Sequence, residues 1–161
     1  MKRTFLKLVA VFFVVAGCAQ TSSRAPFRLT PALQVSLQNE VLESINRIRS
    51  SENQSALSLS LALEKAAKAH SKDMSKQNRP WHFSSNGQSP LQRVAAQNYQ
   101  GQFLGEVISE SYETRQQTIT AWMSDPVTRA IILDRLAQEM GVGIHQDPSG
   151  KVWWTVVFGR P

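Results

Sequence analysis

Apolar residues recur at helical spacing from residue 30 onward. Thr30 and Pro31 form a typical helix start, and the apolar residues that follow are three and four positions apart, as in an amphipathic helix packed by one face. This apolar stripe consists of Leu33, Leu37, Val41, Ile45 and Ile48. Residues 50–55 are polar and end the predicted helix.

A second helical pattern extends from Ser58 or Ser60 to about Lys76. His70 lies on its apolar stripe. A single histidine in that position is more often a core or boundary residue than a ligand, and we interpret His70 in this way. Residues 78–89 are then predicted to form a loop, because proline, glycine and other turn formers are frequent there.

The loop contains Trp, His and Phe at positions 81–83. Loops on a rigid scaffold often carry functional side chains, whereas packing of the two aromatic rings would also explain the trio. Both interpretations of His82 therefore remain open. Beyond the loop, Ser89 and Pro90 begin a short helix that can end at Asn98, a residue type that tolerates a left-handed C-terminal cap.

An apolar, β-prone run at residues 103–108 predicts a strand that carries Glu106. We expect the Glu106 carboxylate to lie at the end or edge of this strand. The segment that follows, up to Trp122, is polar and helical in character. The strand and the helices after it are predicted to meet around this one acid.

A helix break follows Trp122. Asp125 is predicted to cap a new helix, with Pro126 at the first helical position, where the missing N–H of proline costs nothing. The residues after Pro126 are largely apolar, and the helix is predicted to continue through Ile132 to Leu136.

The C-terminal residues predict two strands, 140–145 and 151–158, joined by a turn. In the second strand, Val152, Trp154, Val156 and Phe158 lie on one side and Trp153, Thr155 and Val157 on the other. Because both sides are largely apolar, this strand belongs inside a sheet that is covered on both faces. The fold class is therefore predicted as α+β, with a small, mainly antiparallel sheet between helices. His145, just before the turn, is expected to be exposed.

The first 17 residues have the order of a secretory signal. Basic residues precede an apolar run, 8–15, that is too short to span a bilayer. Small residues then lead directly into Cys18, the only cysteine, as in the lipobox of bacterial lipoproteins, which this stretch resembles. We predict a signal peptide at 1–17, an acylated Cys18 with a tether at 18–29, and one domain at 30–161.

These assignments predict an exported protein held at a membrane by acylated Cys18. If the cell has two membranes, Ala19 stands where an aspartate usually retains lipoproteins at the inner one, so the outer membrane facing the periplasm is favoured. A single cysteine excludes intrachain disulfides, and the domain must rely on its core.

The net charge of +6 does not predict a nucleic-acid partner. Removal of the signal would take away three of the 18 basic residues and none of the 12 acidic ones, leaving a mild excess. Acids and bases are interspersed in the rest of the chain, without a basic run.

Many positions, in order, match one family. They are Asn46 to Arg49, Leu59 through Ala66, His70 to Met74, Arg93, Gly105-Glu106, Trp122, Ser124 to Pro126, Arg129, Ile132-Leu133 and Gly141 to Gly143. On these residues the stretch from Leu37 to Gly159 resembles the CAP superfamily, also called SCP-like, in its bacterial form. The resemblance implies a three-layer α-β-α sandwich, in agreement with the hydrophobic pattern.

The resemblance also implies a cleft in which two histidines and two glutamates can hold a divalent cation. His82 and Glu106 match one residue of each kind. Thr128 replaces the second histidine, and Glu110 and Glu113 are candidates for the second glutamate by proximity alone. Because a hydroxyl is a poor ligand for transition metals, we expect at best a weak site. Calorimetry should then detect a higher cation affinity in Thr128→His. No cofactor is predicted.

Two functions are compatible with these residues. The first is a non-enzymatic binding module for a lipid, a cell-wall fragment or a partner protein. The second is a hydrolase of an envelope substrate that uses His82 and Glu106 as an acid/base pair, although no nucleophile motif is present. Alternatively, Glu106 only receives hydrogen bonds from Arg93 or a helix N-terminus, and His82 only packs with its aromatic neighbours.

Overall fold

The computed structural model describes residues 28–111 and 114–161. The elements in chain order are α1 (Pro31–Ser51), β1 (Ser58–Leu59), α2 (Leu61–Gln77), α3 (Pro90–Ala95), β2 (Gln102–Ser111), α4 (Arg115–Ser124), α5 (Pro126–Ile132), β3 (Glu139–Gln146) and β4 (Val152–Arg160). The predicted signal peptide, Cys18 and most of the predicted tether lie outside the described residues.

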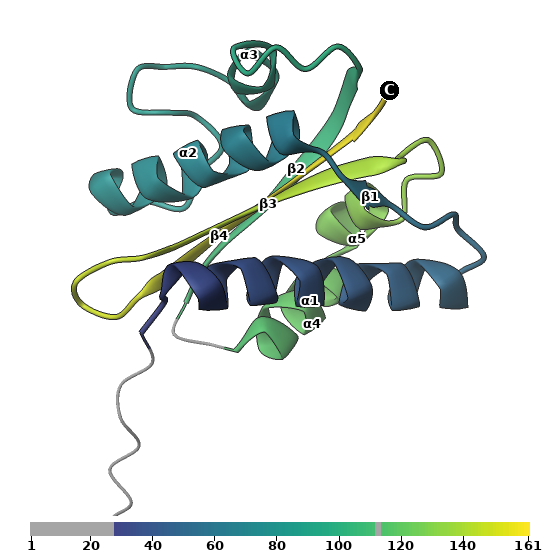
Figure 1. Cartoon of the computed structure of the whole chain (residues 1–161), viewed down its shortest axis with the longest axis horizontal. Helices are drawn as coiled ribbons and strands as arrows, with labels where there is room; N and C mark the ends of the chain where they lie inside the picture. Colours follow the sequence, from purple (N-terminus) through teal and green to yellow (C-terminus); the bar gives the residue numbers. More distant parts are fainter. Residues whose placement is uncertain (1–27, 112–113) are drawn as a thin grey trace, which may run out of the picture.

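The four strands form one sheet in the order β1-β3-β4-β2. The pairs β3–β4 and β2–β4 are antiparallel, and the two-residue β1, which the sequence did not predict, is parallel to β3. Helices α2 and α3 cover one face of the sheet, and α1, α4 and α5 cover the other (Figure 1). The predicted α+β fold, a three-layer α-β-α sandwich, is confirmed.

Three helix starts, at Thr30, Ser89 and Asp125, are those that the sequence predicted. The Thr30 side chain accepts a hydrogen bond from the N–H of Leu33, and Ser89 forms a capping box with Gln92. The Asp125 carboxylate accepts from the N–H groups of the first turn of α5. Each cap satisfies backbone donors that have no partner inside the helix.

The end of α5 corrects the sequence prediction. The helix stops at Ile132 and does not reach Leu136. Arg49, which is fully buried, donates hydrogen bonds to the carbonyl oxygens of Ile132 (2.7 Å) and Asp134 (3.0 Å). These oxygens would accept the bonds of a longer helix, so the guanidinium replaces the next helical turn.

The two sides of β4 belong to two different cores, as its alternation predicted. Val152, Trp154, Val156 and Phe158 join the core beneath α1, α4 and α5. Val157 joins the smaller core beneath α2 and α3, and Thr155 on the same side accepts a hydrogen bond from Ser71 of α2. His145, expected to be exposed, is half-buried on this side, opposite Trp153.

Two features fix the helices on β3. At Gly141 and Gly143, a Cβ atom would lie 2.1 and 2.2 Å from backbone atoms of α2, so the close approach of that helix requires glycine. On the other side, Gln34 and Gln38 of α1 donate to the carbonyl oxygens of Ile144 and Val142, beyond the point where β1 ends. The exposed edge of β3 is thereby hydrogen-bonded without a longer strand.

Candidate functional site

Glu106 lies in the middle of β2, on the face of the sheet covered by α2 and α3. Successive residues of a strand point to opposite faces, so Val107 enters the other core with Ile119 and Trp122 of α4. The prediction that α4 and α5 meet around Glu106 is therefore wrong. The groups around this acid come instead from α2, α3 and the loop between them.

Both carboxylate oxygens of Glu106 are hydrogen-bonded. Oε2 accepts from Nη2 of Arg93 at 2.6 Å, and Oε1 lies 2.9 Å from Nδ1 of His82. The side chains of Glu106 and Arg93 are only 2% and 5% exposed, whereas that of His82 is 49% exposed. The carboxylate is therefore a buried ion-pair partner, and the imidazole connects it to the surface.

Arg93 also fixes the loop that carries His82. Its Nη1 donates to the carbonyl oxygens of His82 (2.7 Å) and Gln88 (3.2 Å) and to the Ser84 hydroxyl. Arg93 lies in α3, whose start is set by the Ser89 capping box. One side chain thus determines both the charge environment of Glu106 and the position of its histidine partner.

His70 is the third group beside Glu106. It is fully buried, as its place on the apolar stripe predicted, and its Nε2 lies 2.9 Å from the carbonyl oxygen of Trp81 and 3.8 Å from Oε1 of Glu106. Its Nδ1 has no hydrogen-bond partner among the described residues. Burial lowers the pKa of His70, and the Glu106 carboxylate offsets this only in part.

The aromatic residues beside His82 pack with each other. The Trp81 and Phe83 rings are 5.6 Å apart between centroids, and the Arg79 guanidinium lies 3.9 Å above the Trp81 ring. His82 points away from this pair of rings toward Glu106. Aromatic packing therefore explains Trp81 and Phe83 but leaves the imidazole available.

The geometry defines what His82 can do chemically. With Nδ1–H donating to Glu106, Nε2 carries a lone pair on the half-exposed side and makes no hydrogen bond with the described residues. A histidine oriented by a carboxylate in this way can accept a proton or bind a cation. Within residues 28–111 and 114–161, however, no three His, Cys, Asp or Glu side chains form a metal-binding group.

The other predicted site residues have separate partners. The Thr128 hydroxyl donates to the carbonyl oxygens of Trp122 in α4 and of Asp125, the N-cap of α5. Glu110, on the same face of β2 as Glu106, forms an ion pair with Lys151 at 2.8 Å. Glu113 lies outside the described residues. The assignment of these three residues to a cleft stays a prediction.

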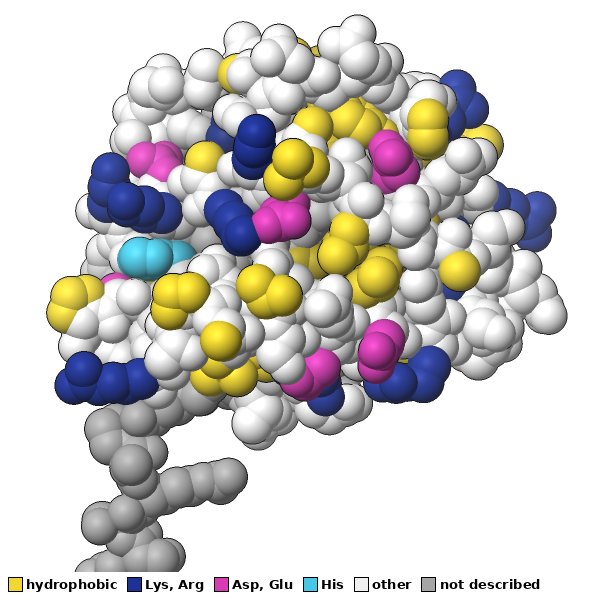
Figure 2. Space-filling model, in the orientation of Figure 1, with side chains coloured by type: hydrophobic (Ala, Val, Ile, Leu, Met, Phe, Trp, Pro, Cys, Tyr) yellow, Lys and Arg dark blue, Asp and Glu magenta, His cyan; other side chains and the backbone are white. Residues whose placement is uncertain are grey.

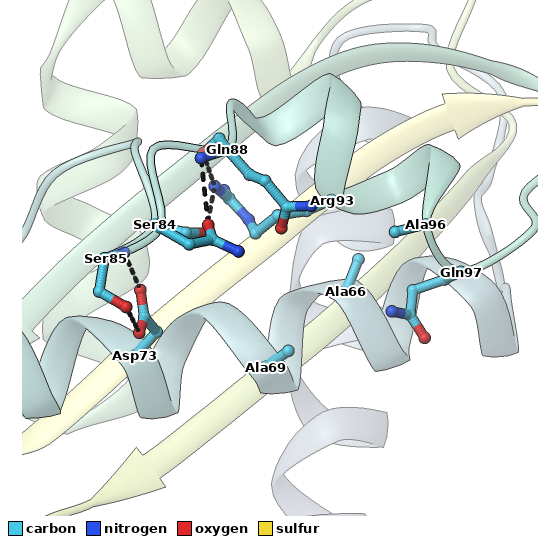
Figure 3. Close-up of a pocket in the computed structure, with 10 residues that line it drawn as sticks. Ala66, Ala69, Asp73, Ser84, Ser85, Gln88, Arg93, Ala96 and Gln97 are labelled. Carbon is cyan, nitrogen blue, oxygen red and sulfur yellow. Dashed lines mark hydrogen bonds between the residues drawn. The ribbon is translucent and has the colours of Figure 1, made fainter.

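A pocket of about 220 Å³ lies between α2 and α3, and the sequence did not predict it (Figure 3). Small and polar residues line it. Ala66, Ala69 and Asp73 come from α2, Ser84, Ser85, Asn86 and Gln88 from the loop, and Arg93, Ala96 and Gln97 from α3 and its C-terminal end. Arg93 is shared with the Glu106 cluster, while His82 and Glu106 do not line the pocket. The only signal in the sequence was the spacing of positions 66, 69 and 73, which places them on one side of a helix.

Asp73 joins the helix to the loop at one end of this pocket (Figure 3). Its carboxylate accepts from the backbone N–H of Ser85 (2.7 Å), the Ser85 hydroxyl (2.6 Å) and Nε2 of Gln77 (2.9 Å). Burial alone would raise the pKa of Asp73, but these hydrogen bonds outweigh it and lower the pKa. Asp73 is therefore an anion already supplied with donors.

Comparison with known proteins agrees with this architecture. The structure is similar to an outer surface protein from Borrelia burgdorferi, with 18% identity and a TM-score of 0.71 over 76% of this chain and 90% of that one. An extracellular protein containing an SCP domain, from Bacillus anthracis, is 23% identical with a TM-score of 0.74 over 84% of this chain and 45% of that one. A cysteine-rich secretory protein from Staphylococcus aureus is 14% identical with a TM-score of 0.64, covering 84% and 42% respectively.

These likenesses establish the fold. The chain spans less than half the length of the Bacillus and Staphylococcus proteins, and no curated protein matches it significantly. Within the described part of the chain, no helix is long and apolar enough to cross a membrane. The family model described as "Cysteine-rich secretory protein family", or CAP, matches residues 42–158, most of the domain. The chain therefore belongs to the CAP family.

Proposed function

We propose that this protein is a lipid-anchored component of the cell envelope whose CAP domain binds a cell-wall fragment without catalysing a reaction. The observation that carries the proposal is the pocket between α2 and α3. It is lined by hydroxyl, amide and carboxylate groups above three alanines, a lining that suits a ligand rich in hydroxyl and amide groups. A lipid chain or a large apolar partner would leave these groups without hydrogen bonds.

The size of the pocket limits what enters it. Pockets for drug-sized ligands usually measure about 300–1,000 Å³, and this one measures about 220 Å³. It therefore accommodates one sugar ring or one amino-acid residue of a larger molecule. Asn86 and Gln97, at the loop and beyond α3, provide amide groups that can both donate and accept hydrogen bonds.

The location is proposed on two grounds. The signal and the lipobox-like residues before Cys18 predict an exported, acylated chain, and the outer membrane is favoured if the cell has two membranes. The structural neighbours are described as outer surface, extracellular and secretory proteins. A binding module held at the membrane would contact cell-wall fragments in the same compartment.

The Glu106 cluster, which lies beside the pocket, argues against a strong cation centre. Glu106 has both oxygens engaged, and the Thr128 hydroxyl donates to the backbone carbonyls of Trp122 and Asp125. A cation at His82 would have to compete with the Arg93 guanidinium for the only nearby carboxylate in the cluster described above. We therefore propose that the metal tetrad implied by the family resemblance is degraded in this chain.

Calorimetry with a soluble muropeptide, the disaccharide-peptide unit of bacterial cell wall, tests the binding proposal. Ala69→Leu places a larger side chain in the pocket and should weaken binding about tenfold or more, which corresponds to 1.4 kcal/mol. Ala95→Leu makes the same change on an exposed position of α3 outside the pocket and should leave affinity unchanged. Absence of muropeptide binding, or equal affinity in both variants, would reject the cell-wall proposal.

One observation favours hydrolysis as a second candidate function. The 2.9 Å contact between His82 and Glu106 orients the imidazole as in acid/base sites, with Nε2 on the exposed side. The substrate would be an envelope polymer, with water as the nucleophile. If purified protein releases soluble fragments from cell wall and His82→Ala abolishes the release, catalysis replaces binding as the function. Release that survives in His82→Ala excludes His82 as the base.

A further inference from the structure

The outward face of α2 is a basic ridge formed by Lys65, Lys68, Lys72 and Lys76. Their spacing of three and four residues places them along one side of the helix over about 16 Å. Lys65, Lys72 and Lys76 are exposed, and Lys68 is half-buried. Figure 2 shows Lys and Arg side chains at intervals along the surface that α2 occupies in Figure 1.

The charges of this basic ridge are largely uncompensated. Lys68 pairs with Glu64 of the preceding turn, whereas Lys65, Lys72 and Lys76 form no ion pair with described residues. The other acid of α2, Asp73, is turned toward the loop by its bonds to Ser85. A positive field therefore extends from the helix into solvent.

The positive charge of α2 affects His145 of the neighbouring β3. The pKa of His145 is lowered first by burial and then by the positive charge of Lys72, with Lys76 acting in the same direction. The Asp147 carboxylate acts in the opposite direction and offsets this effect only in part. The positive charge of Lys72 and Lys76 therefore reaches the end of β3 that lies beside α2.

The shape of the ridge indicates its partner. The lysines stand on a convex helix surface and not in a groove, so they can meet a flat surface more readily than they can enclose a chain. Leu61, in line with them at the N-terminal end of α2, is 65% exposed and adds an apolar contact. A cluster of lysines on one surface is attracted to an anionic bilayer by charge alone.

We propose that the domain docks on an anionic lipid surface through the basic ridge of α2. The contact is separate from the pocket and from His82, and it needs no acyl chain. It would hold the domain in one orientation on the membrane, with α1, on the opposite face of the sheet, turned away from the lipid. Each lysine at such a surface contributes about a fivefold factor to binding.

The test uses the full chain, purified in detergent and reconstituted into vesicles of phosphatidylcholine alone or mixed with phosphatidylglycerol. Acetylation of Lys65, followed by mass spectrometry, reports docking because this lysine is retained in every variant. We expect Lys65 to react about fivefold or more slowly on the anionic vesicles. The protection should disappear at 1 M salt, where the Debye length falls to about 3 Å.

The variant Lys72→Gln/Lys76→Gln should lower the equilibrium constant for docking about 30-fold. Lys65 should then react at the rate seen on neutral vesicles. Arg47→Gln/Arg135→Gln makes the same change in net charge at exposed positions outside α2 and should leave Lys65 protected. Equal Lys65 rates on neutral and anionic vesicles would overturn the proposal. Equal protection by soluble polyphosphate, without a bilayer, would overturn the assignment of lipid as the partner.

Discussion

At the scale of single residues, the burial of Glu106 determines which partners its carboxylate needs. A carboxylate with 2% exposure is stable as an anion only if donors replace its hydration, and Arg93 and His82 provide them. Arg93 is itself buried and holds the loop through three further acceptors. The pair is therefore a structural centre of the domain, whatever ligand the neighbouring pocket accepts.

Replacing Arg93 alone should therefore lower the stability of the domain. In Arg93→Met, the buried Glu106 carboxylate loses its main hydrogen-bond partner, and we expect the free energy of unfolding to fall by about 3–5 kcal/mol. In Arg93→Met/Glu106→Gln the charge is gone as well, so part of that loss should be recovered. Urea unfolding of the single and double variants measures the difference.

Arg47→Met provides the matched control on α1. Its side chain is 70% exposed and lies 3.9 Å from Glu43, so its replacement should change the free energy of unfolding by about 0.5 kcal/mol or less. A double variant no more stable than Arg93→Met would show that the unpaired Glu106 charge is not the source of the loss.

His70 should make stability depend on pH. Burial lowers its folded-state pKa below the usual 6.5, so the unfolded chain binds a proton that the folded chain resists. The stabilisation is complete above pH 6.5 and is lost as pH falls through the lowered pKa. We expect the free energy of unfolding to decrease from about pH 7 to about pH 5, and less steeply in His70→Gln.

His145 contributes in the same direction, since burial and Lys72 also lower its pKa. His145→Gln should therefore reduce the slope too, and the double variant should show the sum of both effects. Asp73 does not contribute to this slope. Its pKa is lowered from 3.8, so its carboxylate takes up a proton only at more acidic pH. If His70→Gln keeps the full slope between pH 7 and 5, the proton uptake occurs elsewhere.

The sequence predicted several of these residues but not their connection. Arg93 was one of two candidate donors to Glu106, and His70 was assigned to the core or its boundary from its place on a helical apolar stripe. The meeting of positions 70, 82, 93 and 106 depends on how α2, α3 and β2 pack, which no single stretch of the chain encodes. The pocket between α2 and α3 was missed for the same reason.

At the scale of elements, glycine sets the distance between α2 and β3. A methyl group at Gly143 would lie 2.2 Å from the backbone of Ala67, and the helix backbone cannot yield as a flexible side chain would. Gly143→Ala should therefore destabilise the domain by about 1–3 kcal/mol or more through overpacking. Thermal unfolding followed by circular dichroism measures the loss.

Gly87→Ala separates overpacking from backbone strain. Nothing lies within 4 Å of a Cβ at Gly87, but its φ of +83° is unfavourable for alanine and should cost about 1–2 kcal/mol. The Gly143 variant should also displace α2 and thus alter the pocket, whereas the Gly87 change stays in the loop. An unchanged melting temperature in Gly143→Ala would show that α2 can move away from β3 without cost.

The elements were predicted best where neighbouring residues determine them. Thr30, Ser89 and Asp125 cap helices through side chains that bond within three residues, and the alternation along β4 follows directly from its side-chain pattern. The end of α5 depends on Arg49, more than 80 residues away in the chain. β1 is only two residues long and exists because β3 offers it a partner, so its own sequence carries no clear signal.

At the scale of the whole molecule, the features proposed for function lie on one side of the sheet. The pocket, His82 and the basic ridge all belong to α2, α3 and the loop between them, while α1, α4 and α5 form the other face. A domain docked by α2 would hold its pocket beside the lipid surface, with the proposed cell-wall ligand binding close to the membrane. The proposed attachment at Cys18 would then determine how long the domain stays there.

The mass of the mature chain tests that attachment directly. After expression of the full precursor in a bacterial host and extraction in mild detergent, the denatured mass should correspond to residues 18–161 plus acyl chains on Cys18. Each buried methylene of an acyl chain contributes about 0.8 kcal/mol, so two or more chains hold the protein at the membrane independently of the basic ridge. Cys18→Ser should lose this mass and shift to the precursor or to a form without acyl chains. An unmodified Cys18 in the wild-type protein would make the domain a periplasmic or secreted one, and α2 would then be its main membrane contact.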